Sequence, residues 1–548
     1  MIRAFACAAV VILSHTACDR PASPPSPAPT ATATLSPSSS SGKDVSTIHW
    51  VGKRRLAADT NAASVLTLLN LPESTKLAEQ TLDKLALAPW RLLKGDPATN
   101  GAPTALLRPL LDDLVAEESH WTFYHPTNAG GGWSLAIRLP PDRASLWRTN
   151  LVAVFESLTG GKAENTATGF SLKSQYSVSF LLPDTNGLTA LTVAKTGAQF
   201  PTPSVQQFTN WLSFSLDLAA INRAFAFGWS LPANCPRAEM HTTGDGVSVT
   251  TRGALNFATP PALKIEPWNI PTNLIHDPLT SFVACRAAQP LLESLPFWPK
   301  LGLGEVSAQF YLWSQVGLPF QTYFAAPVSD VSNRLAGLSS RLILANSWLA
   351  TNGLGRFTNT SDGRLLWADL MIMEPWLNKN HQPGSDWLAG GFFGVIRTNR
   401  LAPGELLAQF QASPSIVYYD WEITEQRVTD WLYLGQFLRL ALHQAQVPPE
   451  SAAIKWLVAA GAQLGNCGTV IHYQAPAVLT FNRRSSLGLS AAELHILVDW
   501  MESPRFPIGA YSVIAPPEDL TRRTMQKMAA MQPSPATNAP GTNQPAPP

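Results

Sequence analysis

The acidic residues between positions 420 and 430 are the side chains best suited to chemistry. Asp420 and Glu422 close an aromatic segment that is predicted to be a strand, and Glu425 and Asp430 follow it. Alternation along a strand places Asp420 and Glu422 on one face, opposite the aromatic side chains. Two carboxylates beside aromatic rings could serve an extracytoplasmic glycosidase-like hydrolase, one as acid and one as base or nucleophile. The alternative, which we favour, is a solvated strand face followed by a helix whose first turn attracts acids.

The histidines are weaker candidates. His495 and Asp499 are four residues apart on a predicted helix and could hydrogen-bond. A catalytic pair would also need a nucleophile, and the G-x-S-x-G motif that would supply one is absent. We therefore expect a pair on the surface of the helix. His472 alternates with apolar residues, which is typical of a half-buried, satisfied histidine. His120 and His125 flank an aromatic stretch, with no carboxylate recognised nearby to complete a metal site. Because H-E-x-x-H, P-loop and calcium-loop motifs are also absent, the sequence predicts no catalytic residue, metal or cofactor.

The composition describes a weakly charged folded body. The chain is 45% hydrophobic and 14% charged, with a net charge of +1. It has no basic run, which argues against nucleic acid as a partner. Five of its 18 tryptophans lie near loop signals, where partly exposed rings could stack on sugars or accept an apolar partner: Trp121, Trp268, Trp298, Trp376 and Trp387.

Three cysteines lie in the body of the chain, namely Cys235, Cys285 and Cys467. No two of them have the spacing of metal ligands. Two interpretations stay open, one disulfide with a free thiol left over, or three buried free thiols.

The first 44 residues resemble the leader of a bacterial lipoprotein. Arg3 precedes an apolar run of about ten residues, which suits a signal peptide and is too short to span a bilayer. Small residues at 16 and 17 precede Cys18, the expected site of lipid attachment, although His15 departs from the aliphatic residue that the family prefers. Residues 18–44 are rich in proline and serine and are expected to form a disordered tether, as is the tail at 516–548. The leader implies export and a lipid anchor on the periplasmic side of a membrane, with a soluble periplasmic or secreted protein as the alternative.

The elements between these ends recur in order. Residues 45–120 read as helical, with breaks expected at Pro72 and Pro89. A strand at 133–139, a proline and a helix at 143–158 are followed by hairpins, and a similar order returns from 319 to 372. A further hairpin is expected at 237–257. The last third is helix-rich, and Ser490 with Glu493 forms a capping box that opens a helix.

This organisation resembles uncharacterised bacterial envelope lipoproteins with repeated strand–helix–hairpin modules. We expect an α+β fold of antiparallel sheets, each covered on one face by helices, in two or three related modules. The predicted divisions are a signal peptide at 1–17, the tether at 18–44, a helical region at 45–120, modules at 121–258, 259–375 and 376–515, and the tail at 516–548. The resemblance implies no known activity. We expect a non-enzymatic envelope protein that binds a protein, lipid or glycan partner.

Overall fold

The structure is a computed structural model. It describes residues 45–94, 102–124, 131–174, 176–183, 187–195, 209–225, 231, 234–287, 289–290, 307–317, 321–351, 353–370, 373–382, 384–394, 400–411, 413–441, 451–503 and 506–507. The predicted signal peptide, Cys18, the tether and the tail lie outside the described residues.

Within the described residues, a single antiparallel sheet of 20 strands forms the frame of the molecule. The first ten strands are β1 (Val45–Trp50), β2 (Ser119–Tyr124), β3 (Gly132–Arg138), β4 (Glu164–Thr166), β5 (Gly169–Lys173), β6 (Tyr176–Leu181), β7 (Leu188–Lys195), β8 (Leu212–Leu216), β9 (Arg237–Gly244) and β10 (Val249–Asn256). The second ten are β11 (Leu279–Arg286), β12 (Gln309–Gln315), β13 (Thr322–Pro327), β14 (Arg356–Asn359), β15 (Leu365–Ala368), β16 (Trp376–Gln382), β17 (Ser385–Gly391), β18 (Ile416–Ile423), β19 (Asn466–Ala475) and β20 (Val478–Ser485).

The two sets of ten strands follow the same spatial order. Outward from the central pair β10–β20, the first set runs β10, β9, β8, β1, β2, β3, β7, β6, β5, β4. The second set runs β20, β19, β18, β11, β12, β13, β17, β16, β15, β14. Each strand of the first set therefore occupies the place of the strand numbered ten higher in the second. The fold is mixed α+β, as the sequence predicts.

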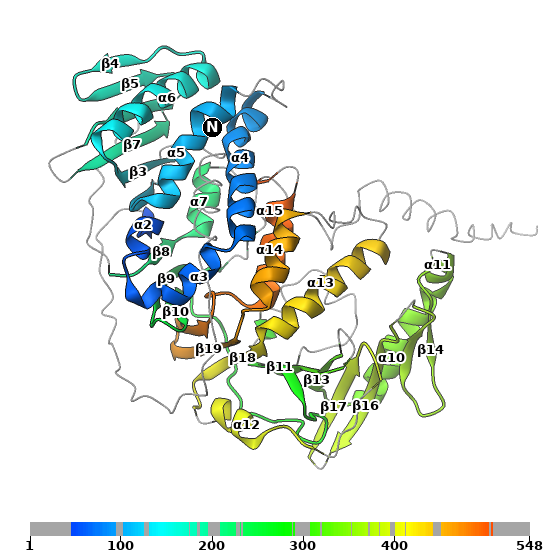
Figure 1. The fold of residues 1–548 in the computed structure, drawn as a ribbon. Helices are drawn as coiled ribbons and strands as arrows, with labels where there is room; N and C mark the ends of the chain where they lie inside the picture. Colours follow the sequence, from blue (N-terminus) through cyan, green and yellow to red (C-terminus); the bar gives the residue numbers. More distant parts are fainter. Residues whose placement is uncertain are drawn as a thin grey trace, which may run out of the picture.

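Helices connect and pack against these strands (Figure 1). They are α2 (Lys53–Leu56), the 3-10 turn η1 (Thr60–Ala62), α3 (Ala63–Leu69), α4 (Pro72–Lys94), α5 (Ala102–Ala116), α6 (Pro141–Thr159), α7 (Leu218–Phe225), α10 (Val331–Leu344), α11 (Asn346–Thr351), α12 (Gly404–Gln411), α13 (Thr424–Ala441), α14 (Ala452–Gly461) and α15 (Ala491–Glu502). Figure 1 shows α4 beside α14 and α15, so helices from the two ends of the sequence lie together in the middle of the molecule. No described helix has both the length and the apolar character required to cross a bilayer.

The largest hydrophobic core joins distant parts of the chain. It contains strand residues of the first set such as Trp133 and Phe180, together with Leu85 of α4 and Leu494 of α15. A second core lies among β11, β12, β13, β17 and β18, where Phe410 of α12 packs against Phe282. The C-terminal helices therefore stabilise the N-terminal strands by burying apolar surface against them.

Several predicted elements are confirmed. β3 and α6 correspond to the predicted strand and helix, β9 and β10 form the predicted hairpin, and the capping box of Ser490 and Glu493 opens α15. The expected break at Pro89 is wrong, because α4 continues through it to Lys94. Proline forgoes one helical hydrogen bond, and the neighbouring Ala86 and Trp90 are buried in the core, which favours continuation of the helix.

One of the predicted domain boundaries lies between the two sets of strands, and two others separate residues that belong to one strand or to paired strands. The division after residue 258 lies between the two sets of ten strands. The division after residue 120 lies inside β2, and the one after residue 375 separates β15 from its partner β16. The predicted helical region also begins with β1, which pairs with β2 and β8.

Candidate functional site

The carboxylates of Asp420 and Glu422 do not face solvent. They are 8% and 5% exposed, so the expected solvated strand face is wrong. Both side chains lie on one face of β18, and Tyr419, which belongs to the second core, lies on the other face of the same strand. Helix α13 contacts β11, β18 and β19. Helix α15 also reaches this site, since the N–H of Ala491 donates to Glu422 Oε1 at 2.7 Å.

A row of polar residues runs from Asp420 toward the centre of the sheet. Asp420 lies opposite Thr469 of β19, which lies opposite Arg483 of β20. Arg483 donates to Thr469 Oγ1 at 2.9 Å and pairs through two nitrogens with Glu493 of α15. The arginine therefore ties the capping box of α15 to the sheet beside the β10–β20 pair.

Burial controls the ionisation of this acidic pair. Burial, assisted by the nearby charge of Glu422 and opposed by that of Arg483, raises the pKa of Asp420 to about 7. Burial also raises the pKa of Glu422, although the hydrogen bond from Ala491 and the charge of Arg427 favour its ionised form. The paired acids have perturbed ionisation, but neither lines the apolar pocket described below.

The pair His495 and Asp499 is also buried rather than on the surface. The two residues are 7% and 5% exposed. Asp499 accepts a short hydrogen bond from the fully buried Arg439 of α13, and His495 Nε2 lies 3.6 Å from the same carboxylate. Burial lowers the pKa of His495. The expected surface pair is therefore a buried link between α13 and α15, which the i, i+4 spacing could not reveal.

The remaining sequence candidates have mainly structural surroundings. Trp121 and Trp387, which were expected to be partly exposed, are buried in strands, whereas Trp298 lies outside the described residues. His472 is half-buried and bonded to Ser415 through Nδ1 at 3.1 Å, as predicted. His125 lies outside the described residues. The cysteines at 235, 285 and 467 are all free, and burial raises the pKa of each thiol.

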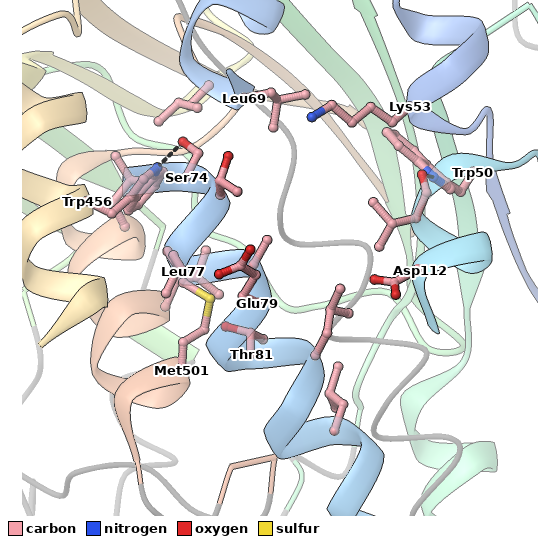
Figure 2. A pocket seen from close by; sticks show the side chains of 18 of the residues that line it. Trp50, Lys53, Leu69, Ser74, Leu77, Glu79, Thr81, Asp112, Trp456 and Met501 are labelled. Carbon is pink, nitrogen blue, oxygen red and sulfur yellow. Dashed lines mark hydrogen bonds between the residues drawn. The ribbon is translucent and has the colours of Figure 1, made fainter. Parts of the chain in front are cut away.

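An apolar pocket of about 320 Å³ lies against α4 (Figure 2). Figure 2 shows α4 crossing the site, with Trp456 and Met501 from the C-terminal helices on one side and Trp50 on the other. Leucines provide much of the remaining lining: Leu69, Leu77, Leu82, Leu85, Leu487, Leu489, Leu494 and Leu497. The volume is at the lower end of the range of about 300–1,000 Å³ that is typical of ligand pockets.

Hydrogen bonds hold the walls of this pocket together. Trp456 Nε1 donates to Ser74 Oγ of α4 at 2.9 Å, as Figure 2 shows. Lys84 of α4 donates to the carbonyl of Met501 at 2.8 Å, at the C-terminal end of α15. On the opposite wall, Trp50 Nε1 donates to the carbonyl of Val115 at 3.1 Å. These bonds fix α4 to α14 and α15, and β1 to α5.

A few polar groups accompany the apolar lining. Among the described residues, the buried hydroxyl of Thr81 has no hydrogen-bond partner. The half-buried Lys53 reaches over the pocket toward Leu69 in Figure 2. Arg108, also in the lining, pairs with Asp83 and Asp112 at the surface of α4 and α5. The lining therefore combines an apolar interior with a few charged groups, among them the ammonium of Lys53 and the carboxylates of Glu79 and Asp112.

A second cluster joins His49, Glu118 and His120. His49 of β1 lies directly opposite His120 of β2, and Glu118 precedes β2. Glu118 Oε1 lies 3.2 Å from His49 Nε2 and 3.8 Å from His120 Nε2. The sequence interpretation of His120 missed this carboxylate, although a spacing of two places both side chains on one strand face. His49, 71 residues away, could be found only through strand pairing.

The same cluster has perturbed ionisation. The hydrogen bond from His49 and the nearby charge of Arg55 outweigh burial and lower the pKa of Glu118 to about 2. Burial is the largest cause that lowers the pKa of His120 to about 4, and the neighbouring His49 acts in the same direction. At neutral pH, Glu118 is therefore ionised and His120 is neutral.

Comparisons with protein-family models, with curated proteins and with solved structures find no match for this chain.

Proposed function

We propose that this chain is an exported, membrane-tethered envelope protein that binds the acyl chain of a lipid-like molecule. The observation that carries the proposal is the apolar pocket of about 320 Å³ against α4. Its leucines and Met501 offer the apolar surface that a hydrocarbon chain buries on leaving water. Its volume suits one chain of moderate length better than a complete two-chain phospholipid.

The polar groups of the pocket favour an amphiphile over a pure hydrocarbon. Lys53 can attract a carboxylate or another anionic head group at the edge of the pocket. An apolar body with a few placed polar groups is the common composition of a small-molecule site.

The pocket supports this function better than the acidic pair supports hydrolysis. Asp420 and Glu422 are buried under helices, and Glu422 is occupied by the backbone of Ala491. The burial of Trp121 and Trp387 also removes two of the rings that a glycan could have used. The hydrolase alternative therefore has less structural support than ligand binding.

Filling the pocket tests the proposal. A fluorescent fatty acid, dansylaminoundecanoic acid, is titrated into the full mature chain and displaced with unlabelled dodecanoic acid. We expect saturable binding that Ala78→Phe weakens by at least about tenfold, because Ala78 lines the pocket and a phenyl ring would occupy it. Ala336→Phe, the same substitution on the exposed face of α10, is the control and should bind as the wild type does. Equal binding by the Ala78→Phe variant, or no binding by the folded wild type, would refute the proposal.

The membrane tether is tested separately. If Cys18 carries lipid, the exported wild-type protein should enter the detergent phase of Triton X-114, because acyl chains anchor a protein by burying their CH₂ groups. Cys18→Ala should move the protein to the aqueous phase. A Cys18→Ala protein that is exported and remains in the detergent phase would contradict the anchor.

We also propose that the body consists of two related modules, at about 45–256 and 279–485. The support is the shared order of ten strands on each side of the β10–β20 pair. In this proposal the acyl pocket lies where the modules meet, since α4 belongs to the first and α14 to the second. Superposition in an experimental structure should align each strand with its counterpart numbered ten higher, and an equally good fit in a shifted order would contradict duplication.

A further inference from the structure

We propose that His49, Glu118 and His120 form a binding site for a divalent transition-metal ion, with Zn²⁺ as the preferred ion. Their potential ligand atoms all lie within 4.8 Å of one another. The two imidazole rings are 4.6 Å apart between centroids, which follows from their directly opposed positions on β1 and β2. The strand pairing therefore brings two nitrogen donors to the carboxylate of Glu118.

The distances suit a metal ion held between these groups. Metal–ligand bonds of about 2.0–2.2 Å in a tetrahedron place neighbouring donors roughly 3.4 Å apart. The distances of 3.2 Å and 3.8 Å from Glu118 Oε1 to the two Nε2 atoms lie on either side of this value. Two imidazoles and one carboxylate are a donor set that zinc uses with a fourth position open to water.

Two arginines complete the surroundings of Glu118. Arg55 Nη1 lies 3.0 Å from Oε1, and Arg138 Nε lies 3.5 Å from Oε2. Their side chains are 56% and 52% exposed, so each can withdraw into solvent with little loss of packing. A metal on Oε1 would displace Arg55, whereas Arg138 could stay on Oε2 and orient the carboxylate.

This competition distinguishes a metal site from a simple ion-pair network. If the cluster binds metal, removing Arg55 removes a competitor for Oε1 and should tighten binding. The adjacent Arg54 provides a matched control, because it pairs with Glu117 instead of Glu118. His241 of β9 provides a second control: it lies on the same sheet face, since Ser213 is opposite both His49 and His241.

The experiment measures Zn²⁺ binding to the full mature chain after treatment with EDTA, in competition with a chromophoric chelator. We expect one equivalent of Zn²⁺, affinity lowered by more than about tenfold in His120→Ala and Glu118→Gln, and unchanged affinity in His241→Ala. Arg55→Gln should bind Zn²⁺ several-fold more tightly than Arg54→Gln. With Co²⁺ as the probe, the wild type should show the intense visible absorption of a four-coordinate site.

Three results would overturn the proposal: no stoichiometric Zn²⁺ binding by the folded wild type, equal affinity in the Glu118→Gln variant, or equal affinity in Arg55→Gln and Arg54→Gln. Thermal melts identify any variant that fails to fold. If His120→Ala unfolds, Glu118→Gln and Arg55→Gln decide the question, because Gln preserves the size of Glu118 and Arg55 is exposed. The acyl-chain titration is independent of these results, since none of the three proposed ligands lines the pocket.

Discussion

At the scale of single residues, buried charges between the sheet and the helices control how the protein responds to pH and substitution. Asp420, Glu422, Asp499 and Arg439 are all nearly inaccessible to water. Burying a charge is costly unless a partner compensates for it. These residues should therefore be much more sensitive to substitution than exposed residues of the same type.

Asp420 should make the protein less stable as the pH rises. Its folded pKa of about 7 lies above the ordinary value of 3.8, so the folded state binds its proton more tightly than the unfolded state does. The resulting stabilisation is complete below pH 3.8 and is lost as the pH rises through 7. Asp420→Asn cannot ionise, so at pH 8 its free energy of unfolding should exceed that of the wild type by on the order of 2 kcal/mol. Near pH 4, where Asp420 is protonated in the folded wild type, this difference should disappear. Urea unfolding at both pH values measures the difference, and an advantage that is equal at both would be inconsistent with the raised pKa.

Removing the carboxylate of Asp499 should be strongly destabilising. Asp499→Ala would leave Arg439, which is 0% exposed, without this buried negative partner. We expect a loss of about 3–5 kcal/mol in the free energy of unfolding. Asp386→Ala is the comparison, because Asp386 forms its ion pair with His381 at an exposed site and should contribute less than about 1 kcal/mol. Similar losses in the two variants, measured by urea unfolding, would contradict the role assigned to burial.

At the scale of elements, local signals in the sequence were sufficient where neighbours in the chain determine the structure. The capping residues Ser490 and Glu493 are three positions apart, and the β9–β10 hairpin is formed by adjacent segments. Alternation correctly placed Asp420 and Glu422 opposite Tyr419 and Trp421, but it fails at the start of β18, where a register shift brings Ile416 into the same core as Tyr419. It could not show that α13, which directly follows β18, packs back against the strand, or that α15, from a segment 69 residues later, reaches Glu422, because both placements depend on tertiary packing. The same limitation hid the pairing of His49 with His120.

The cap of α15 should contribute measurably to stability. The Ser490 side chain accepts from the N–H of Glu493, and the Glu493 carboxylate accepts from the N–H of Ser490. Ser490→Ala should lower the free energy of unfolding by about 1 kcal/mol. Ser340→Ala, on the exposed face of α10, should change it by no more than about 0.5 kcal/mol. If Ser490→Ala and Ser340→Ala change the free energy of unfolding equally in urea unfolding, the cap of α15 does not contribute the expected stability.

At the scale of the whole molecule, the sheet and the pocket are related by the position of the central helices. The two sets of ten strands meet at β10 and β20, and α14 and α15 from the C-terminal part pack against α4 from the N-terminal part. The pocket occupies this meeting place, with its walls joined by the bonds of Trp456 and Lys84. Sites between packed units are common positions for ligand binding. The packing of α4 with α14 and α15 therefore forms the apolar pocket next to the sheet.

Calorimetric titration of the full mature chain with dodecanoic acid tests the central claim most directly. We predict one site per chain, with a binding enthalpy that becomes more negative as the temperature rises, because burial of apolar surface gives a negative heat-capacity change. The Ala78→Phe variant should lose this signal while keeping the melting behaviour of a folded protein. Binding without a negative heat-capacity change, an unchanged signal in Ala78→Phe, or no binding by the folded wild type would contradict the assignment of the pocket as an acyl-chain site.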